Sequence, residues 1–217
     1  MKAESKYYQR ALSLVEVLVI ISVLVILLGL ILPALANAKK KTKRVACTNN
    51  LKQLTLGLGL WAEEHSGDYP PRVSTNRGGT LEWANTKEVY RHFLSAKIDI
   101  GSPKLLFCPS DIDRNLAKSF SELNNEKISY FLNLSAVRTD ERPHILSGDR
   151  HLTYNGVQYP NGSYLISTQQ MLAWGLKLHP KVGNISLTDG SVQATINNNL
   201  QRIILGLGPQ TNWLAFP

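Results

Sequence analysis

The sequence predicts an α+β protein in which one long N-terminal helix packs on a small antiparallel β-sheet. Three patterns predict this fold: an apolar run over residues 12–38, a helical repeat of apolar side chains after it, and two alternating runs near the C-terminus. The chain has 217 residues and two cysteines. This length suits one membrane anchor and one globular domain of ordinary size.

The apolar run extends from Leu12 to Ala38, and Glu16 is its only ionisable side chain. The run is long enough to cross a bilayer as a helix, which takes about 20 residues. It is also longer than the apolar region of a cleaved secretory signal, which has about 7–15 residues. A charge buried in lipid costs roughly 3 kcal/mol or more, so Glu16 needs a partner. A plain anchor or a cleaved signal stays an alternative, but neither requires Glu16.

A short basic leader, Met1 to Arg10, precedes the junction Ala11-Leu12-Ser13-Leu14-Val15-Glu16. This junction resembles the type III signal of type IV pilins and type II secretion pseudopilins. The resemblance implies that a prepilin peptidase cleaves between Ala11 and Leu12 and methylates the new amine of Leu12. It also implies that Glu16 compensates an N-terminal amine during assembly, which agrees with the cost of burying an unpaired charge. Ala11 and Leu12 differ from the glycine and phenylalanine of the family pattern.

After Ala38 the apolar pattern changes from continuous to periodic. Apolar side chains recur at spacings of three and four, which is typical of one face of an amphipathic helix: Leu51, Leu54, Leu58 and Trp61. We therefore predict one helix from about Leu12 to about His65, roughly 80 Å long at 1.5 Å per residue. Residues 12–38 are expected to be its transmembrane or filament-core part, and residues 39–66 its amphipathic continuation.

The net charge of +8 is concentrated near the apolar run. The leader, residues 1–11, carries +2, the segment 39–44 carries five basic residues, and Glu16 contributes −1, so residues 45–217 retain only about +2. We therefore expect no nucleic-acid partner for the globular part. The positive-inside rule alone places the C-terminus in the cytoplasm, because more basic residues follow the span than precede it. The pilin resemblance implies the opposite, a periplasmic head anchored in the bacterial inner membrane, and we adopt that orientation.

Residues 67–217 are rich in turn residues and are predicted to form the periplasmic globular head. Short motifs in and before the head resemble those of pilin-like proteins with a C-terminal processing-associated domain. These motifs are Cys47-Thr-Asn-Asn-Leu-Lys-Gln-Leu, Phe107-Cys108-Pro109-Ser110-Asp111, Ser129-Tyr130 with Asn133, Gly148-Asp149-Arg150, and His179 followed after nine residues by Asp189-Gly190. The last spacing names that group.

Residues 183–188 and 191–196 alternate in polarity on either side of Asp189-Gly190. An Asp-Gly pair between alternating runs predicts a hairpin with a type I′ turn, which needs positive φ at both central residues. A turn is therefore the simplest role for Asp189 and Gly190. If the turn brings Asp189 near His179, the pair would form a hydrogen bond or a cation site. Related pseudopilins hold calcium in C-terminal loops, although calcium prefers oxygen ligands to histidine, and we predict no cofactor.

Cys47 and Cys108 are the only cysteines. An extracytoplasmic head lies in an oxidising compartment, where a disulfide between them is allowed. Closing a loop of about 60 residues would stabilise the fold by roughly 4 kcal/mol. Two buried free thiols are the alternative. The sequence has no Cys-x-x-Cys, which argues against thiol redox chemistry and cysteine-rich zinc sites.

The sequence contains no Gly-x-Ser-x-Gly, His-Glu-x-x-His or phosphate-binding loop. We therefore expect a structural subunit of a type II secretion pseudopilus or type IV pilus rather than an enzyme. Its partners would be prepilin peptidase, other pilin subunits and the inner membrane. One alternative is a pilin-mounted binding or adhesion protein with exposed aromatic residues on its head, such as Tyr69, Trp83, Tyr154 and Trp213. The other is a membrane-anchored periplasmic hydrolase, which requires acidic residues and His179 to converge in a cleft.

Overall fold

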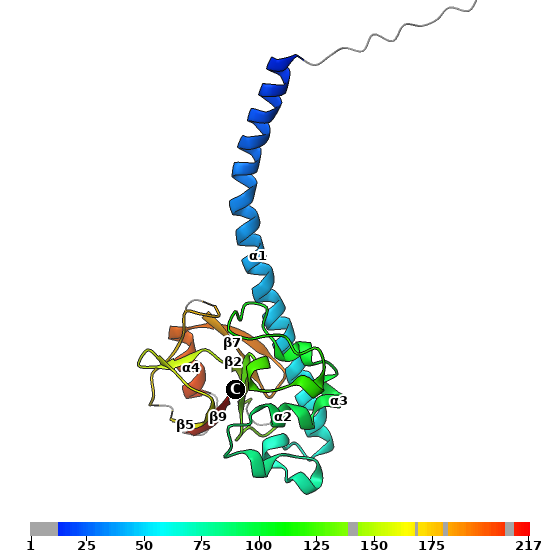
Figure 1. Cartoon of the computed structure of the whole chain (residues 1–217). Coiled ribbons are helices and arrows are strands. Elements are labelled where there is room, and N and C mark those ends of the chain that lie inside the picture. The colour runs from blue at the N-terminus through cyan, green and yellow to red at the C-terminus, as the bar shows by residue number, and fades with distance from the viewer. Residues whose placement is uncertain (1–12, 139–142, 168, 180–181, 207–210) are drawn as a thin grey trace, which may run out of the picture. The chain divides into compact units, whose positions relative to one another are not determined.

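The computed structural model describes residues 13–138, 143–167, 169–179, 182–206 and 211–217, which form two compact units divided between Thr42 and Lys43 (Figure 1). The α-helices are α1 (Leu14–Glu64), α2 (Tyr90–Ser95), α3 (Lys97–Ile100) and α4 (Asn197–Gly206). Short 3₁₀ helices cover Pro70–Arg72, Thr75–Arg77, Leu81–Trp83, Pro103–Leu106, Phe120–Glu122 and Asn125–Lys127. The strands are β1 (Tyr130–Asn133), β2 (Ile145–Asp149), β3 (Leu152–Tyr154), β4 (Val157–Gln158), β5 (Gly162–Ser167), β6 (Leu172–Trp174), β7 (Val182–Leu187), β8 (Val192–Ile196) and β9 (Thr211–Phe216).

The first unit is the apolar part of α1. The side chains of residues 13–42 are all exposed, and the helix continues through Pro33. Within the described chain, α1 is the one helix that is long and apolar enough to cross a membrane. The predicted long apolar helix is therefore confirmed, and its described part begins at Leu14 and ends at Glu64.

The second unit is built on a six-stranded sheet with the order β5-β9-β1-β2-β7-β8, in which every neighbouring pair is antiparallel. A separate three-stranded antiparallel sheet has the order β4-β3-β6. The predicted antiparallel sheet is thus confirmed. It has more strands than the one hairpin that the sequence clearly predicted. All of its strands have six residues or fewer, and such short runs leave little periodic signal in a sequence.

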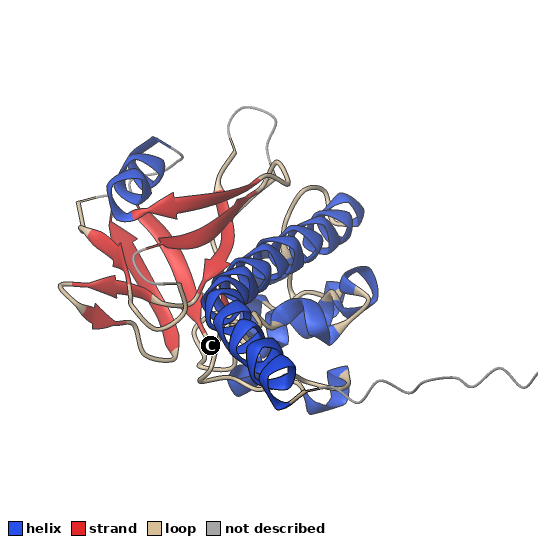
Figure 2. Ribbon diagram, turned by 90° about the horizontal axis from the view of Figure 1, so that it is seen from above, coloured by secondary structure: helices blue, strands red, loops and turns tan. Residues whose placement is uncertain are grey.

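Apolar side chains fill both faces of the main sheet because strand residues alternate between the two faces. Tyr130 and Leu132 of β1 join the α1 core, together with Cys47, Leu51, Leu54, Leu58 and Trp61 of α1. Phe131, between them in the sequence, joins the α4 core with Leu200 and Ile204. Figure 2 shows the sheet on one side of the C-terminal part of α1 and short helices on the other.

The two glycines near the middle of the packed α1 segment differ in what surrounds them. A Cβ on Gly57 would lie 2.8 Å from the carbonyl oxygen of Asp99, so α3 packs directly on the backbone of α1 at this point. A Cβ on Gly59 would meet only the end of the Arg138 side chain, at 3.7 Å. Gly57 is therefore required by helix packing, whereas Gly59 is not.

One local prediction differs from the structure. The β7–β8 hairpin is present, but only Gly190 has positive φ in its turn, so the turn is not type I′. Its loop covers residues 188–190, and the amide of Gly190 donates to the carbonyl of Leu187, as in a type I turn followed by a left-handed glycine.

The contrast between the two glycines gives a matched test. We expect Gly57→Ala to lower the free energy of unfolding by about 1–3 kcal/mol, because the added methyl group overlaps backbone atoms. We expect Gly59→Ala to raise it by up to about 1 kcal/mol, because alanine favours a helix over glycine. The measurement is denaturant unfolding of the full chain in detergent, followed by tryptophan fluorescence, since all four tryptophans lie in residues 43–217. Equal effects of the two substitutions would contradict the packing assigned to Gly57.

Candidate functional site

The first candidate site is the N-terminal end of α1. The amide of Ser13 donates to Glu16 Oε2 at 2.8 Å, and the amide of Glu16 donates to Ser13 Oγ at 3.2 Å. These reciprocal bonds form a capping box, which satisfies amides that have no partner within the helix. Glu16 therefore has a local structural role that the sequence interpretation did not assign to it. Ala11 and Leu12, the predicted processing residues, lie outside the described residues.

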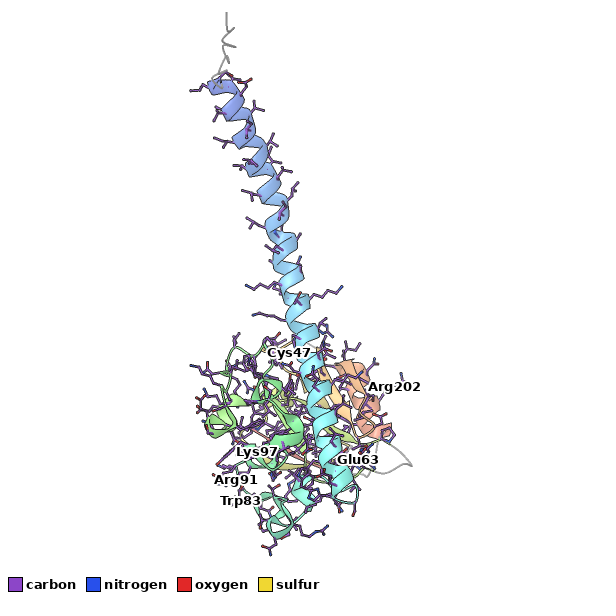
Figure 3. The ribbon with its side chains drawn as sticks, turned by 90° about the vertical axis from the view of Figure 1, so that its right-hand side faces the viewer. Cys47, Glu63, Trp83, Arg91, Lys97 and Arg202 are labelled. Carbon is purple, nitrogen blue, oxygen red and sulfur yellow. A yellow bond between two sulfur atoms is a disulfide. The ribbon has the colours of Figure 1, made fainter. Side chains whose placement is uncertain are left out.

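The second candidate site is a buried cluster around a disulfide. Cys47 of α1 and Cys108 are joined by a disulfide with a Cα–Cα distance of 4.7 Å. The expected pairing is therefore present in the structure, and it links α1 to a segment 61 residues later in the chain. In the chain-entropy model, a loop of this size corresponds to about 4 kcal/mol of stabilisation. Figure 3 marks Cys47 near the start of the packed α1 segment and Glu63 near its end.

Head motifs that are far apart in the sequence meet at this disulfide. Cys108 Sγ lies 3.6 Å from His179 Nε2, and His179 Nε2 lies 3.9 Å from Asp149 Oδ2. The hydroxyl of Tyr130 donates to the carbonyl of Cys47 at 3.1 Å. We name this set, Cys47, Cys108, Tyr130, Asp149 and His179, the disulfide cluster. It brings together residues from five of the motifs that carry the family resemblance.

Asn184 of β7 holds the Asp149 carboxylate in place. Its amide and its side-chain Nδ2 both donate to Asp149 Oδ2, at 2.7 and 3.0 Å, and its Oδ1 accepts from Thr48 Oγ1 of α1. Asp149 Oδ1 has no hydrogen-bond partner among the described residues. Neither Asn184 nor Thr48 was predicted from the sequence to belong to a site. The one available signal was a polar residue, Asn184, on the core-facing side of an alternating strand. Such a position indicates a buried hydrogen bond but does not identify its partner.

The electrostatics of the cluster favour neutral groups. Burial raises the pKa of Asp149 to about 7, and this effect outweighs the two hydrogen bonds from Asn184, which lower it. Burial lowers the pKa of His179 to about 4, assisted by the Arg44 guanidinium. At mildly acidic pH the two side chains are therefore in contact without forming a charged pair. His179 is 7% exposed and Asp149 is 1% exposed, so they do not form the open cleft that a hydrolase requires.

An ion network lies in the same part of the head. Arg150 Nε and a second guanidinium nitrogen donate to the two oxygens of Asp111, at 2.8 and 3.0 Å, and both side chains are buried. The partly exposed Asp113 lies 3.5 Å from Arg150 and 3.2 Å from Lys177 Nζ. Its neighbour Lys177 is the main cause of the lowered pKa of Asp113. His151 Nε2 lies 3.8 Å from Asp113, which completes the network.

His179 and Asp189 do not meet. The carbonyl of His179 accepts from the amide of Val182 at the start of β7, and Asp189 follows the end of β7, where its Oδ1 accepts from the amide of Ser191. A six-residue strand that rises about 3.3 Å per residue places them about 20 Å apart. The joint cation site considered for this pair, calcium included, is therefore not formed. Asp189 instead lines a groove of about 290 Å³ beside Leu56 and Leu60 of α1.

The aromatic residues considered for ligand binding do not form an exposed cluster. Of the four, Tyr69 is buried, Trp83 and Trp213 are half-buried, and Tyr154 is 39% exposed. The guanidinium of Arg91 lies over the Trp83 ring at 3.8 Å from its centroid, so one face of that ring is already in contact. These positions do not supply the aromatic surface that the adhesion alternative requires.

Comparisons with protein-family models, with curated proteins and with solved structures found no match. The family interpretation therefore depends on the quoted residues and on the site geometry.

The Asp111–Arg150 pair gives a stability test. Arg150→Met leaves the Asp111 carboxylate buried without its cation, and we expect a loss of about 3–5 kcal/mol in the free energy of unfolding. Arg72→Met is the matched control, because its partner Asp68 is 38% exposed and the pair is worth less than about 1 kcal/mol. Denaturant unfolding followed by fluorescence measures both. Adding Asp111→Asn should restore part of the loss, and losses of similar size in Arg150→Met and Arg72→Met would contradict the assigned role.

Proposed function

We propose that this chain is a structural subunit of a pilin-like filament, either a type II secretion pseudopilus or a type IV pilus. The observation that carries the proposal is the combination at the N-terminus: a basic leader, the Ala11-Leu12 junction, and a helix that is apolar over about seven turns with Glu16 in its first turn. A plain anchor or a secretory signal would use this carboxylate only in the capping box with Ser13, whereas filament assembly would also use its charge.

The exposure of the apolar helix supports the same proposal. Its large apolar side chains from Leu14 to Leu35 are between 42% and 82% exposed, which a helix in water does not tolerate. Lipid covers such a surface while the chain is in the inner membrane. Identical helices of neighbouring subunits would cover it when the chain leaves the membrane and joins a filament.

The disulfide supports a periplasmic location for residues 43–217. Disulfides persist in oxidising compartments and are rare in the cytoplasm. In this proposal prepilin peptidase acts on the cytoplasmic side of the membrane, and the head faces the periplasm before assembly. The chain acts through its contacts with other subunits, and the head distinguishes this subunit from others in the filament.

The first test is the N-terminus of the mature chain. Mass spectrometry of the membrane fraction from cells that express prepilin peptidase should find methylated Leu12 as the first residue. The same cells without the peptidase should yield the chain with its leader intact. An unprocessed N-terminus in the presence of the peptidase, or a cut near Ala36 or Ala38, would remove the proposal.

The second test separates the charge of Glu16 from its capping role. Glu16→Gln keeps a side chain that completes a capping box but removes the charge, whereas Ser13→Ala weakens the cap and keeps the charge. We expect Glu16→Gln to reduce the chain recovered in sheared filaments by about 10-fold or more, because the loss of one buried charge contact costs at least about 1.4 kcal/mol. Ser13→Ala should assemble within about 2-fold of wild type. Normal assembly of Glu16→Gln would show that the charge is not needed.

A further inference from the structure

Three metal-binding side chains converge at the disulfide cluster. Cys47 Sγ, Cys108 Sγ and His179 Nε2 all lie within 4.8 Å of one another. All three residues are buried, with exposed fractions of 0%, 0% and 7%. Two thiolates and an imidazole are a ligand set that zinc favours, whereas calcium and magnesium prefer oxygen.

The distance between Cys108 and His179 suits a shared metal. In a tetrahedral zinc site the sulfur lies about 2.3 Å and the nitrogen about 2.0 Å from the ion, which places the two ligand atoms about 3.5 Å apart. Cys108 Sγ and His179 Nε2 are 3.6 Å apart in the structure. Oxidation keeps the site closed, because the two sulfurs are bonded to each other and neither is a thiolate.

We propose that reduction of the Cys47–Cys108 disulfide opens a Zn²⁺ site whose ligands are Cys47, Cys108 and His179, and that reoxidation expels the ion. A disulfide holds its sulfurs about 2 Å apart and a tetrahedral zinc site holds them nearly 4 Å apart. Rotation of the Cys47 side chain away from Cys108 would supply this separation and leave Cys108 Sγ at its present distance from His179. The site is therefore present in the reduced chain and absent from the oxidised one.

The fourth coordination position has a candidate in Asp149. Its Oδ2 lies 3.9 Å from His179 Nε2 and is held by Asn184, while its Oδ1 has no hydrogen-bond partner among the described residues. A buried carboxylate oxygen without a partner is costly, and binding a cation or a zinc-bound water would remove that cost. Arg44 is close enough to act on both Asp149 and His179. The charges of Zn²⁺, the two thiolates, the Asp149 carboxylate and the Arg44 guanidinium would together sum to zero.

A dithiol can supply the two electrons that reduce the Cys47–Cys108 disulfide. One thiolate of the dithiol attacks a cysteine sulfur, the second thiol resolves the mixed disulfide, and the chain gains two electrons and two protons as two thiols. The dithiol leaves as a disulfide. Zn²⁺ then replaces the two thiol protons, which pass to solvent.

The second group of candidate ligands, Asp111, Asp113 and His151, does not support the same inference. Arg150 forms two hydrogen bonds with Asp111 and lies 3.5 Å from Asp113, and Lys177 contacts Asp113 as well. These cations already neutralise both carboxylates and would repel a metal ion.

The test uses the full chain in detergent, reduced by a phosphine under inert gas, with Co²⁺ as the spectroscopic probe and Zn²⁺ as the competitor. We expect one Co²⁺ per chain, a thiolate-to-cobalt charge-transfer absorption, and displacement of cobalt by Zn²⁺. The oxidised chain should give no such absorption. Zn²⁺ should also raise the unfolding temperature of the reduced chain and leave that of the oxidised chain unchanged.

Single-residue variants distinguish metal binding by the folded site from metal binding by the two free thiols alone. His179→Ala should weaken Co²⁺ binding by the reduced chain about 100-fold or more, whereas His65→Ala, at the other end of the packed α1 segment, should bind as wild type does. Near-ultraviolet circular dichroism checks that each reduced chain is folded. The proposal is overturned by a folded reduced chain that binds no Co²⁺, by equal binding in the two variants, or by a reduced chain that stays unfolded when Zn²⁺ is added.

Discussion

The packing of the C-terminal part of α1 on the main sheet is the interaction on which the rest of the second unit depends. Cys47, Leu51, Leu54 and Leu58 are fully buried, and they cover the face of β1 that carries Tyr130 and Leu132. Without this helix one face of the sheet would be exposed, and an antiparallel sheet needs at least one covered face to be stable in water. The opposite face is covered by the α4 core, so the sheet lies between two apolar layers.

A buried polar cluster next to this packing fixes how the elements fit together. Thr48 of α1, Asn184 of β7 and Asp149 of β2 are joined by hydrogen bonds, and the disulfide joins Cys47 to Cys108 in the same region. Apolar contacts tolerate small shifts, whereas directional hydrogen bonds between buried groups do not. The cluster therefore specifies one register of α1 against the sheet, at the cost of burying a carboxylate.

The sequence predicted the parts of this fold that have a strong period and missed those defined by contacts between distant residues. The apolar run, the Leu51–Trp61 repeat and the β7–β8 hairpin are all local patterns, and each is present in the structure. The other strands, which have two to six residues, and α4 were not predicted, because short runs do not distinguish a strand from a loop. The pairing of Cys47 with Cys108 was predicted because no other cysteine was available.

In the disulfide cluster, too, the sequence indicated a residue but not its contacts with distant residues. His179 was identified from its spacing to Asp189, yet its contacts are with Cys108 and Asp149, which lie 71 and 30 residues away in the sequence. The spacing of nine residues reflects the length of β7 and its turn, not a contact between the two ends. The nine-residue spacing therefore singled out His179 but did not indicate its contacts, because an extended strand separates the residues that it connects.

Glu16 joins the proposed function to the local structure of α1. The capping box uses the amide of Ser13, which cleavage between Ala11 and Leu12 would leave in the mature chain. The free-energy cost of moving a carboxylate out of water is smaller when the carboxylate already accepts a backbone hydrogen bond than when it accepts none. Its second oxygen is then the one available to a neighbouring amine. The cap and the proposed assembly role of Glu16 are therefore compatible, since the cap holds the carboxylate at the helix end and leaves its charge for the contact that we propose with another subunit.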